Sequence, residues 1–181
     1  NLLATSTLGV FDEKDQEVYL RAETAQGIYI NFKNVFDTGF SSMPFGIAQI
    51  GKVFRNEINP RQFLFRMREF EQMEMQYFVR PQDAPAAYIL WKQRRFDYYA
   101  TLGIKSEKLR LKKHDNLVFY AKDAWDIQYE FPFGWNELEG LHYRGDYDLT
   151  QHQKFSGADA SVYDEETKER YIPHVIETSV G

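Results

Sequence analysis

The sequence predicts an α+β fold in which helices flank a mostly antiparallel sheet. Two long β runs, at about 46–58 and 66–79, are separated by the turn residues Asn59-Pro60-Arg61, as in an antiparallel hairpin. Residues 83–102 predict a helix. Strand-like runs dominate the second half of the chain, without the regular alternation of strand and helix that builds a parallel sheet.

The elements before the hairpin are short. Residues 17–21 predict a strand. Apolar residues at helical spacing, among them Ile28 and Phe32, predict a helix over 22–36 with Glu23 in its first turn. Residues 39–44 begin with glycine and end with proline, and they predict a loop.

The helix after the hairpin has Asp83 as a plausible cap and Gly103 as its stop. Residues 106–123 predict a mixed, mostly helical stretch. Strands are then expected at about 124–131 and 137–144, separated by Pro132-Phe133-Gly134. The remaining expected elements are a short helix from Asp146, a strand near 158–163, a turn at 164–168 and a final strand.

Composition indicates one globular domain. The 181 residues are 43% hydrophobic, and their net charge of −5 argues against a protein that coats nucleic acid. The absence of cysteine excludes disulfide scaffolds, Cys-ligated zinc and thiol catalysis. No apolar run approaches the roughly 20 residues of a membrane span, and no signal peptide is recognisable. We therefore expect a cytoplasmic protein without a membrane partner.

The hairpin carries an unusual polar face. Strand alternation groups Val53, Arg55 and Glu57 on the first strand, and on the second strand it groups Arg66, Arg68, Phe70, Gln72 and Glu74. Arginine can hold phosphate or carboxylate, and a phenylalanine ring can stack on a base, so this face could bind a nucleotide. An exposed face with ion pairs has the same pattern. The spacing alone leaves both interpretations open.

Other polar groups give weaker signals. Glu137 and Glu139 alternate on one expected strand and could hold Mg²⁺ or do acid–base work, although one of them could instead pair with Arg144. Glu177 and Ser179 also alternate, as in a compact pocket for an ammonium group. The histidines show no metal-binding spacing, and no Walker or GxGxxG loop occurs. The four histidines are His114, His142, His152 and His174.

Four ordered blocks of the sequence resemble one family. Phe54–Ile58 followed by Arg66–Glu74 resembles motif 2 of class II aminoacyl-tRNA synthetases, in the version found in the homodimeric type of glycyl-tRNA synthetase. The other three blocks, at 19–27, 133–140 and 173–181, look like the same family in the same order. The resemblance covers essentially the whole chain and implies the class II synthetase catalytic core.

The resemblance implies an ATP site and one catalytic residue. Arg55 matches the motif 2 arginine that holds the ATP α-phosphate and the amino acid carboxylate. Glu57 matches the residue that reads the adenine amine, and Phe70 matches the ring that stacks on adenine. Glu137 would also be the Mg²⁺ ligand. The full implied ATP-binding set is Arg55, Asn56, Glu57, Phe65, Arg66, Met67, Arg68, Glu69, Phe70, Glu137 and Leu138.

The resemblance also implies a glycine pocket. Carboxylates around the substrate ammonium would select glycine by holding its charge and excluding larger amino acids. The implied glycine-binding set is Glu23, Phe70, Glu71, Gln72, Met73, Glu74, Glu177 and Ser179. The expected partners are glycine, ATP and tRNA(Gly), and the expected assembly is a homodimer.

Some family features lie outside this sequence. Motif 1 is expected before Asn1, motif 3 directly after Gly181, and the anticodon-binding domain further on, so 1–181 is expected to be a partial catalytic domain with little or no activity of its own. The sequence departs from the family at Ala22 and Thr178, where proline is frequent. The alternative is a non-catalytic binding module on the same fold, such as the accessory subunit of mitochondrial DNA polymerase. Such a module is expected to lose the residues that bind ATP and glycine.

Overall fold

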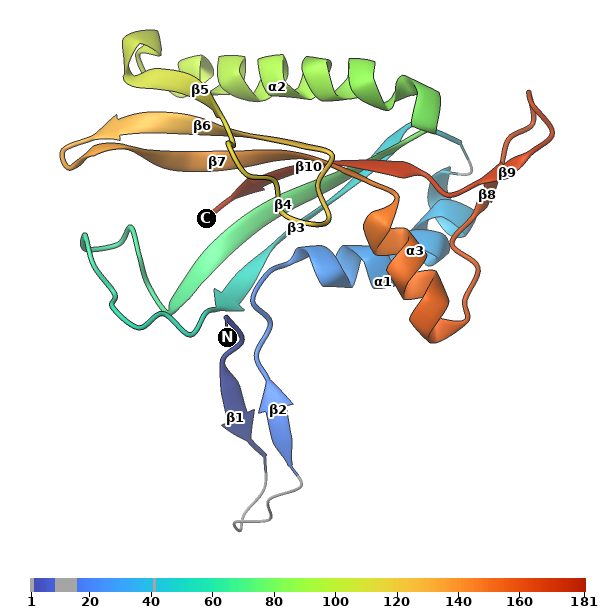
Figure 1. Ribbon diagram of the computed structural model, residues 1–181, viewed down its shortest axis with the longest axis horizontal. Helices are drawn as coiled ribbons and strands as arrows, with labels where there is room; N and C mark the ends of the chain where they lie inside the picture. The colour runs from blue at the N-terminus through green and yellow to red at the C-terminus, as the bar shows by residue number, and fades with distance from the viewer. Residues whose placement is uncertain (1, 9–15, 41) are drawn as a thin grey trace.

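A six-stranded antiparallel sheet forms the centre of the protein (Figure 1). The computed structural model describes residues 2–8, 16–40 and 42–181. The strand order is β3-β4-β10-β7-β6-β5, so the last strand of the sequence lies in the middle of the sheet. The strands are β3 (Phe45–Phe54), β4 (Glu69–Val79), β5 (Leu109–Lys113), β6 (Asp123–Phe131), β7 (Gly134–Gly145) and β10 (His174–Val180).

Helices cover both faces of the sheet. The long helix α2 (Ala84–Thr101) lies on one side, and α1 (Ala25–Val35) and α3 (Tyr147–Ser156) lie on the other, as Figure 1 shows. A π-helical turn, Phe36–Phe40, extends α1. Short 3₁₀ turns precede α2 (Pro81–Asp83) and β5 (Ser106–Lys108). Two two-stranded ribbons complete the described chain: β1 (Thr5–Thr7) with β2 (Glu17–Tyr19), and β8 (Val162–Tyr163) with β9 (Arg170–Tyr171).

Each face of the sheet has its own hydrophobic core. On the α1 side, Phe32 packs against Phe78, with ring centroids 4.6 Å apart, and Phe45 and Leu149 join the same cluster. On the α2 side, the core includes Tyr88, Tyr99, Ile127, Leu141 and Ile176. The sheet therefore buries apolar side chains on both faces.

The structure confirms the α+β class and most of the predicted elements. The predicted helix over 83–102 and the strands near 124–131 and 137–144 are present. Gly157 ends α3 in the left-handed conformation (φ 73°), which glycine adopts without a steric penalty.

Two predictions were wrong. The stretch 106–123 is not mostly helical, since it contains one 3₁₀ turn, strand β5 and an irregular segment. The hairpin strands are also shorter than predicted, because β3 ends at Phe54 and β4 begins at Glu69. Residues 55–68 form a long tip instead of continued strands. Within it, Arg61 and Arg66 form an isolated bridge, and the Arg55 N–H donates to the Arg68 carbonyl at 2.8 Å.

None of the helices in the described part of the chain combines the length and the apolar composition needed to cross a membrane.

Candidate functional site

A buried polar patch lies on the α1 face of the sheet, on the neighbouring strands β4 and β10. On β4, alternation brings Gln72, Glu74 and Gln76 to this face, and their exposed fractions are 5%, 3% and 0%. The register sets Ser179 opposite Glu74 and Glu177 opposite Gln76. The predicted glycine residues Glu74, Glu177 and Ser179 are therefore brought together. The face of a sheet that is covered by a helix is normally apolar. Here it carries buried polar side chains, which indicates a binding site.

Glu74 lies in a small network of hydroxyl groups. The hydroxyl of Thr24, just before α1, donates to Glu74 Oε2 at 2.6 Å, and the Ser179 hydroxyl donates to Oε1 at 3.2 Å. Burial and the nearby charge of Glu177 raise the pKa of Glu74, although the two hydroxyl hydrogen bonds act in the opposite direction. Among the described residues, the partners of Glu74 are hydroxyl groups and none forms an ion pair with it. Such a buried carboxylate suits the capture of a positively charged ligand.

Gln72 adds an unsatisfied acceptor beside Glu74. Its amide nitrogen donates to the Ser179 hydroxyl at 2.8 Å. Its Oε1 is buried and has no hydrogen-bond partner among the described residues. An orphaned buried acceptor costs about 1–3 kcal/mol unless a ligand or water satisfies it. This oxygen therefore points to a ligand that donates hydrogen bonds.

Glu177 has a different environment, because protein donors occupy both of its oxygens. His142 Nδ1 lies 2.8 Å from Oε1, Gln76 Nε2 donates to Oε2 at 2.7 Å, and Arg144 donates to both oxygens. Burial alone would raise the pKa of Glu177, but the His142 hydrogen bond and the Arg144 charge bring it down to about 2. Glu177 is therefore a fixed negative charge whose acceptor sites are already filled.

Arg144, Asp148 and Tyr29 complete the support of this site. Arg144 forms two hydrogen bonds to Asp148 on α3, at 2.7 and 2.8 Å, and is 4% exposed. Burial disfavours the charged guanidinium, but the charge of Glu177 and the hydrogen bonds to Asp148 raise the pKa of Arg144. Tyr29 on α1 donates to Gln76 Oε1 at 2.8 Å. Sequence reasoning gave these residues no role in the site, since only the fold shows that they converge on Glu177.

Glu23 lies two residues before α1, not in its first turn as predicted, at the edge of the patch. Gln26 donates to its carboxylate at 2.8 Å, and its charge contributes to the raised pKa of Glu74. The third carboxylate predicted for the pocket is therefore close enough to act on Glu74 electrostatically.

Arg55 and Phe70 lie next to the pocket, where the hairpin tip begins. The Arg55 guanidinium is 5.3 Å from the Phe70 ring centroid, and its Nε donates to the Ala22 carbonyl at 3.1 Å. The Phe70 ring is also close to Gly181, where a Cβ would lie only 3.1 Å from it. These contacts hold a cation and an aromatic face beside the carboxylate patch, which suits a ligand with both a phosphate and a base.

The predicted ATP residues of the tip do not share one strand face. Glu57 receives an ion pair from Arg66 at 3.5 Å, and Arg68 donates to the Glu57 carbonyl at 2.7 Å. Phe65 packs against Phe131 and Phe133 at the β6–β7 turn, with both centroid distances 5.1 Å. Asn56 and Met67 lie in the same tip. Loop contacts, not strand alternation, position these residues.

Three residues of β4 that belong to the predicted sites lie on the opposite face. Because β4 alternates, Glu69, Glu71 and Met73 point away from the face that carries Gln72 and Glu74. Glu69 pairs with Lys52 at 2.5 Å on the outside of the hairpin. Only the backbone of these three residues borders the patch.

The interpretation of Glu137 and Glu139 as a pair on one face was wrong. The register opposes Gln128 to Glu137 and Ile127 to Glu139, so Leu138 is the extra residue of a β-bulge and the two carboxylates separate. Glu139 lies on the α2 side, 2.7 Å from Arg95 and hydrogen-bonded by Tyr99, so its arginine partner is not Arg144.

Glu137 remains on the side of the patch. The Glu137 side chain is exposed to solvent. The surrounding protein nevertheless desolvates its carboxyl group, and this desolvation, together with the charge of Asp126, raises the pKa of Glu137. The charge of Arg55 opposes this shift. Glu137 and Arg55 therefore interact electrostatically.

Comparison with known proteins assigns the chain to a family. The family model described as tRNA synthetase class II core domain (G, H, P, S and T) matches residues 7–181. The chain belongs to this family. The predicted class II synthetase core is thereby confirmed, together with the six-stranded antiparallel sheet that forms it.

Individual relatives of this class II core are similar along its whole length. The glycine–tRNA ligase of Borrelia garinii subsp. bavariensis is 54% identical over 186 residues, which cover 100% of this chain and 42% of the relative. The glycine–tRNA ligases of Chlorobaculum tepidum and Treponema denticola are 54% and 50% identical and are covered over 39% and 41% of their length. The chain thus spans about two fifths of the curated relatives that it matches.

Proposed function

We propose that the full-length protein containing this class II core activates glycine with ATP and transfers the glycyl group to tRNA(Gly). The observation that carries the proposal is the closed polar patch of Glu74, Ser179 and Gln72, with the orphaned Gln72 oxygen. The names of the relatives, glycine–tRNA ligases at 50–54% identity, support the same activity.

In this proposal the glycine ammonium binds between Glu74 and Gln72. An ammonium has three donors, and Glu74, Gln72 Oε1 and Glu23 would supply the three acceptors. Of the carboxylates expected around the ammonium, Glu177 is not one of these acceptors, because protein donors already occupy its oxygens. Glu177 would act through its charge and by fixing Gln76.

Selection of glycine follows from the walls of the pocket. Thr24 and Ser179 donate to Glu74 at 2.6 and 3.2 Å, and Gln72 donates to Ser179 at 2.8 Å. A side chain on the substrate α-carbon would therefore separate groups that are already bonded. A larger amino acid would leave buried polar atoms unpaired, which is a strong basis for discrimination.

The activation step joins the two halves of the site. The glycine carboxylate oxygen attacks the α-phosphorus of ATP, a P–O bond forms, and the bond to the bridging oxygen breaks to release pyrophosphate. Arg55 would neutralise the charge that develops on the α-phosphate, and Phe70 would stack on the adenine. The protein would contribute mainly orientation and charge stabilisation.

Mg²⁺ is the metal that this reaction implies. The carboxylate oxygens of Glu137 are hard donors of the kind that Mg²⁺ prefers, and desolvation, followed by the charge of Asp126, raises the pKa of Glu137, so a bound cation would stabilise its charged form. Glu137 therefore fits the role of a ligand. When bound, Mg²⁺ would neutralise charge on the ATP phosphates.

We infer that the full-length protein is a homodimer that acts in the cytoplasm, and that motif 1, motif 3 and an anticodon-binding domain lie in the parts of its relatives outside the match. The alternative, a non-catalytic module on the same fold, has no support among the relatives.

Glycine-dependent ATP–pyrophosphate exchange by the full-length protein tests the proposal. We expect exchange with glycine and none with alanine or serine. Exchange that is equal for the three amino acids would overturn the selection argument. No exchange, together with no binding of a glycyl-adenylate analogue, would favour the non-catalytic alternative.

A further inference from the structure

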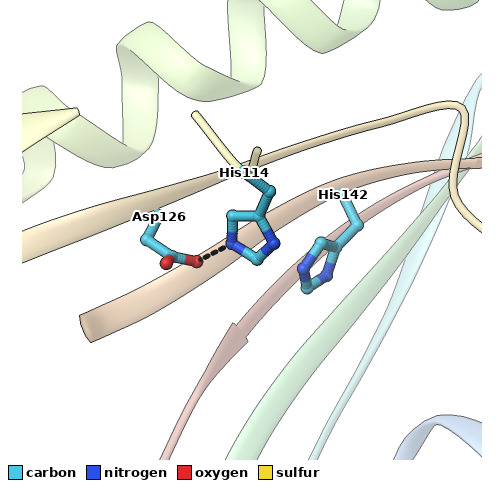
Figure 2. A group of neighbouring side chains, drawn as sticks. All are labelled: His114, Asp126 and His142. Atoms are coloured by element: carbon cyan, nitrogen blue, oxygen red, sulfur yellow. Dashed lines mark hydrogen bonds and ion pairs between the residues drawn. The ribbon is translucent and has the colours of Figure 1, made fainter. Parts of the chain in front are cut away.

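A second polar cluster lies on the same face of the sheet, next to the glycine patch. His114 follows β5, Asp126 lies on β6 and His142 lies on β7 (Figure 2). Each of the three offers one ligand atom, and these atoms are within 4.8 Å of one another. In the view of Figure 2, the His114 ring lies between Asp126 and His142. Sequence reasoning missed this cluster because its members come from three different segments.

The sheet register explains why the three side chains meet. Ala124 lies opposite His142, and the backbone N–H of His114 donates to the Ala124 carbonyl at 3.0 Å. Asp126 is two residues further along β6 and therefore points to the same face. The His114 and His142 rings have centroids 5.9 Å apart. The cluster is thus supported by the backbone of the sheet.

The donor set is that of a transition-metal site. Two imidazoles and one carboxylate are typical of zinc sites that keep one coordination position open. Imidazole nitrogen also distinguishes this set from Mg²⁺ sites, which use oxygen donors. His114 Nε2 and Asp126 Oδ1 are 2.7 Å apart, against roughly 3.3 Å for two ligands on one tetrahedral ion with bonds of about 2.0–2.1 Å. Small side-chain movements would therefore bring the ligands into place.

The surroundings of His142 have the form expected of a metal ligand. Its Nδ1 is 2.8 Å from the carboxylate of Glu177, which is buried and held by Arg144 and Gln76. This contact orients the ring and leaves Nε2 as the nitrogen for a metal. A carboxylate behind a ligating histidine is the common outer-shell arrangement of zinc sites.

A glycine keeps the cluster open. Gly140 lies opposite Asp126 on β7, and a Cβ there would be 2.9 Å from His142 Cε1 and 3.7 Å from Glu137 Oε1. A side chain at this position would crowd the imidazole. The three candidate ligands are all partly buried, so an ion can reach them from solvent.

We propose that His114, Asp126 and His142 bind one Zn²⁺ ion, with an open fourth position that faces the ATP side of the pocket near Glu137. The ion is separate from the Mg²⁺ expected with ATP. By binding His142, the Zn²⁺ ion would also hold its imidazole in place against Glu177. The site does not depend on the proposed function, since metal binding is measured without substrates.

Titration with Co²⁺, a spectroscopic substitute for Zn²⁺, tests the site in the full-length protein after treatment with a chelator. We expect visible d–d absorption that Zn²⁺ abolishes and that excess Mg²⁺ leaves unchanged. The His114→Ala and His142→Ala variants should each weaken Co²⁺ binding by at least about 100-fold, since even outer-shell changes cost 10–100-fold. The matched control, His152→Gln, should keep wild-type binding.

Two results would overturn the proposal. One is a wild-type protein without Co²⁺ absorption, and the other is an His114→Ala variant that binds Co²⁺ as tightly as the wild type. Because His114 is partly exposed, its variant should fold, and far-UV circular dichroism with a thermal unfolding curve checks that it does. If His142→Ala fails to fold, Glu177→Gln replaces it, with an expected loss of about 10- to 100-fold.

Discussion

Glu74 and Glu177 lie on neighbouring strands of one buried patch, yet their surroundings shift their pKa values in opposite directions. Arg144 and His142 hold Glu177 ionised, while burial and the Glu177 charge make Glu74 easier to protonate. One carboxylate thus helps to build the site and the other remains available to a ligand. A proton and a substrate ammonium would compete for Glu74.

The competition predicts a pH dependence for glycine. As pH falls through the raised pKa of Glu74, the carboxyl takes up a proton, and the KM for glycine should rise by about 10- to 100-fold, because a hydrogen bond to a charged group is worth about 1.5–3 kcal/mol. KM values measured from neutral to acidic pH check this. Glu74→Gln should have a high KM that no longer responds to pH in this way. The same acid-side rise in both proteins would exclude Glu74 as its origin.

Arg55 offers a prediction on rate. Arg55→Ala in the full-length protein should lower glycine-dependent ATP–pyrophosphate exchange on the order of 10²–10³-fold, by analogy with the loss of an oxyanion-hole donor. Arg61→Ala, a change at an exposed arginine of the same tip, is the matched control and should keep most of the activity. Near-wild-type exchange by Arg55→Ala would contradict its catalytic role.

Among the elements, α2 is tied to the sheet by a buried ion pair. Glu139 on β7 is 1% exposed, and Arg95 reaches it with two hydrogen bonds of 2.7 and 3.0 Å. Tyr99, one turn further along α2, donates to the same carboxylate. Removing the arginine leaves a buried charge without its cation.

Arg95→Met should therefore destabilise the protein by about 3–5 kcal/mol, the usual cost of breaking a buried ion pair from one side. Urea unfolding followed by circular dichroism measures the change. The neighbouring Arg94 is exposed, so Arg94→Met should cost less than about 0.5 kcal/mol. Equal losses for the two variants would show that the ion pair does not anchor the helix.

The sequence predicted elements well where local patterns decide them. The helix over 84–101 is followed by the stop signal Gly103, and the paired segments of the β3–β4 hairpin consist of residues typical of strands. Tertiary contacts decide the rest. Residues 55–68 look like continued strands but pack as a tip through Phe65, and 109–113 become a strand because β6 offers an edge.

The candidate site was only partly predictable for a similar reason. The resemblance to a family identified Glu74, Glu177 and Ser179, and the register joins them. The bulge at Leu138 could not be foreseen, and it separates Glu137 from Glu139. The His114–Asp126–His142 cluster depends on which strands are neighbours, which spacing along the chain does not reveal.

In the molecule as a whole, two cores share one sheet, so we expect them to unfold together. All three tryptophans lie on β6, β7 or α2, whereas Phe78 is buried in the core on the α1 side. Phe78→Ala should lower stability by about 3–5 kcal/mol. It should also shift the urea transition seen by tryptophan fluorescence as much as the transition seen by circular dichroism.

The control for this prediction is Phe155→Ala, at a ring that is 79% exposed, and it should leave both transitions in place. If Phe78→Ala shifts the circular dichroism transition but not the fluorescence transition, the two faces of the sheet unfold independently.

The central position of β10 also affects how the sheet can form while the chain is being synthesised on the ribosome. Strands β3 and β4 form one hydrogen-bonded group, strands β5 to β7 form another, and only β10 joins them. Since synthesis runs from the N-terminus, the nascent chain holds both groups with open edges at β4 and β7 until residues 174–180 emerge. The same strand brings Glu177 and Ser179, so the growing polypeptide gains its central hydrogen bonds and its pocket in a single late event. Until then, the open edges are surfaces that a chaperone would have to protect.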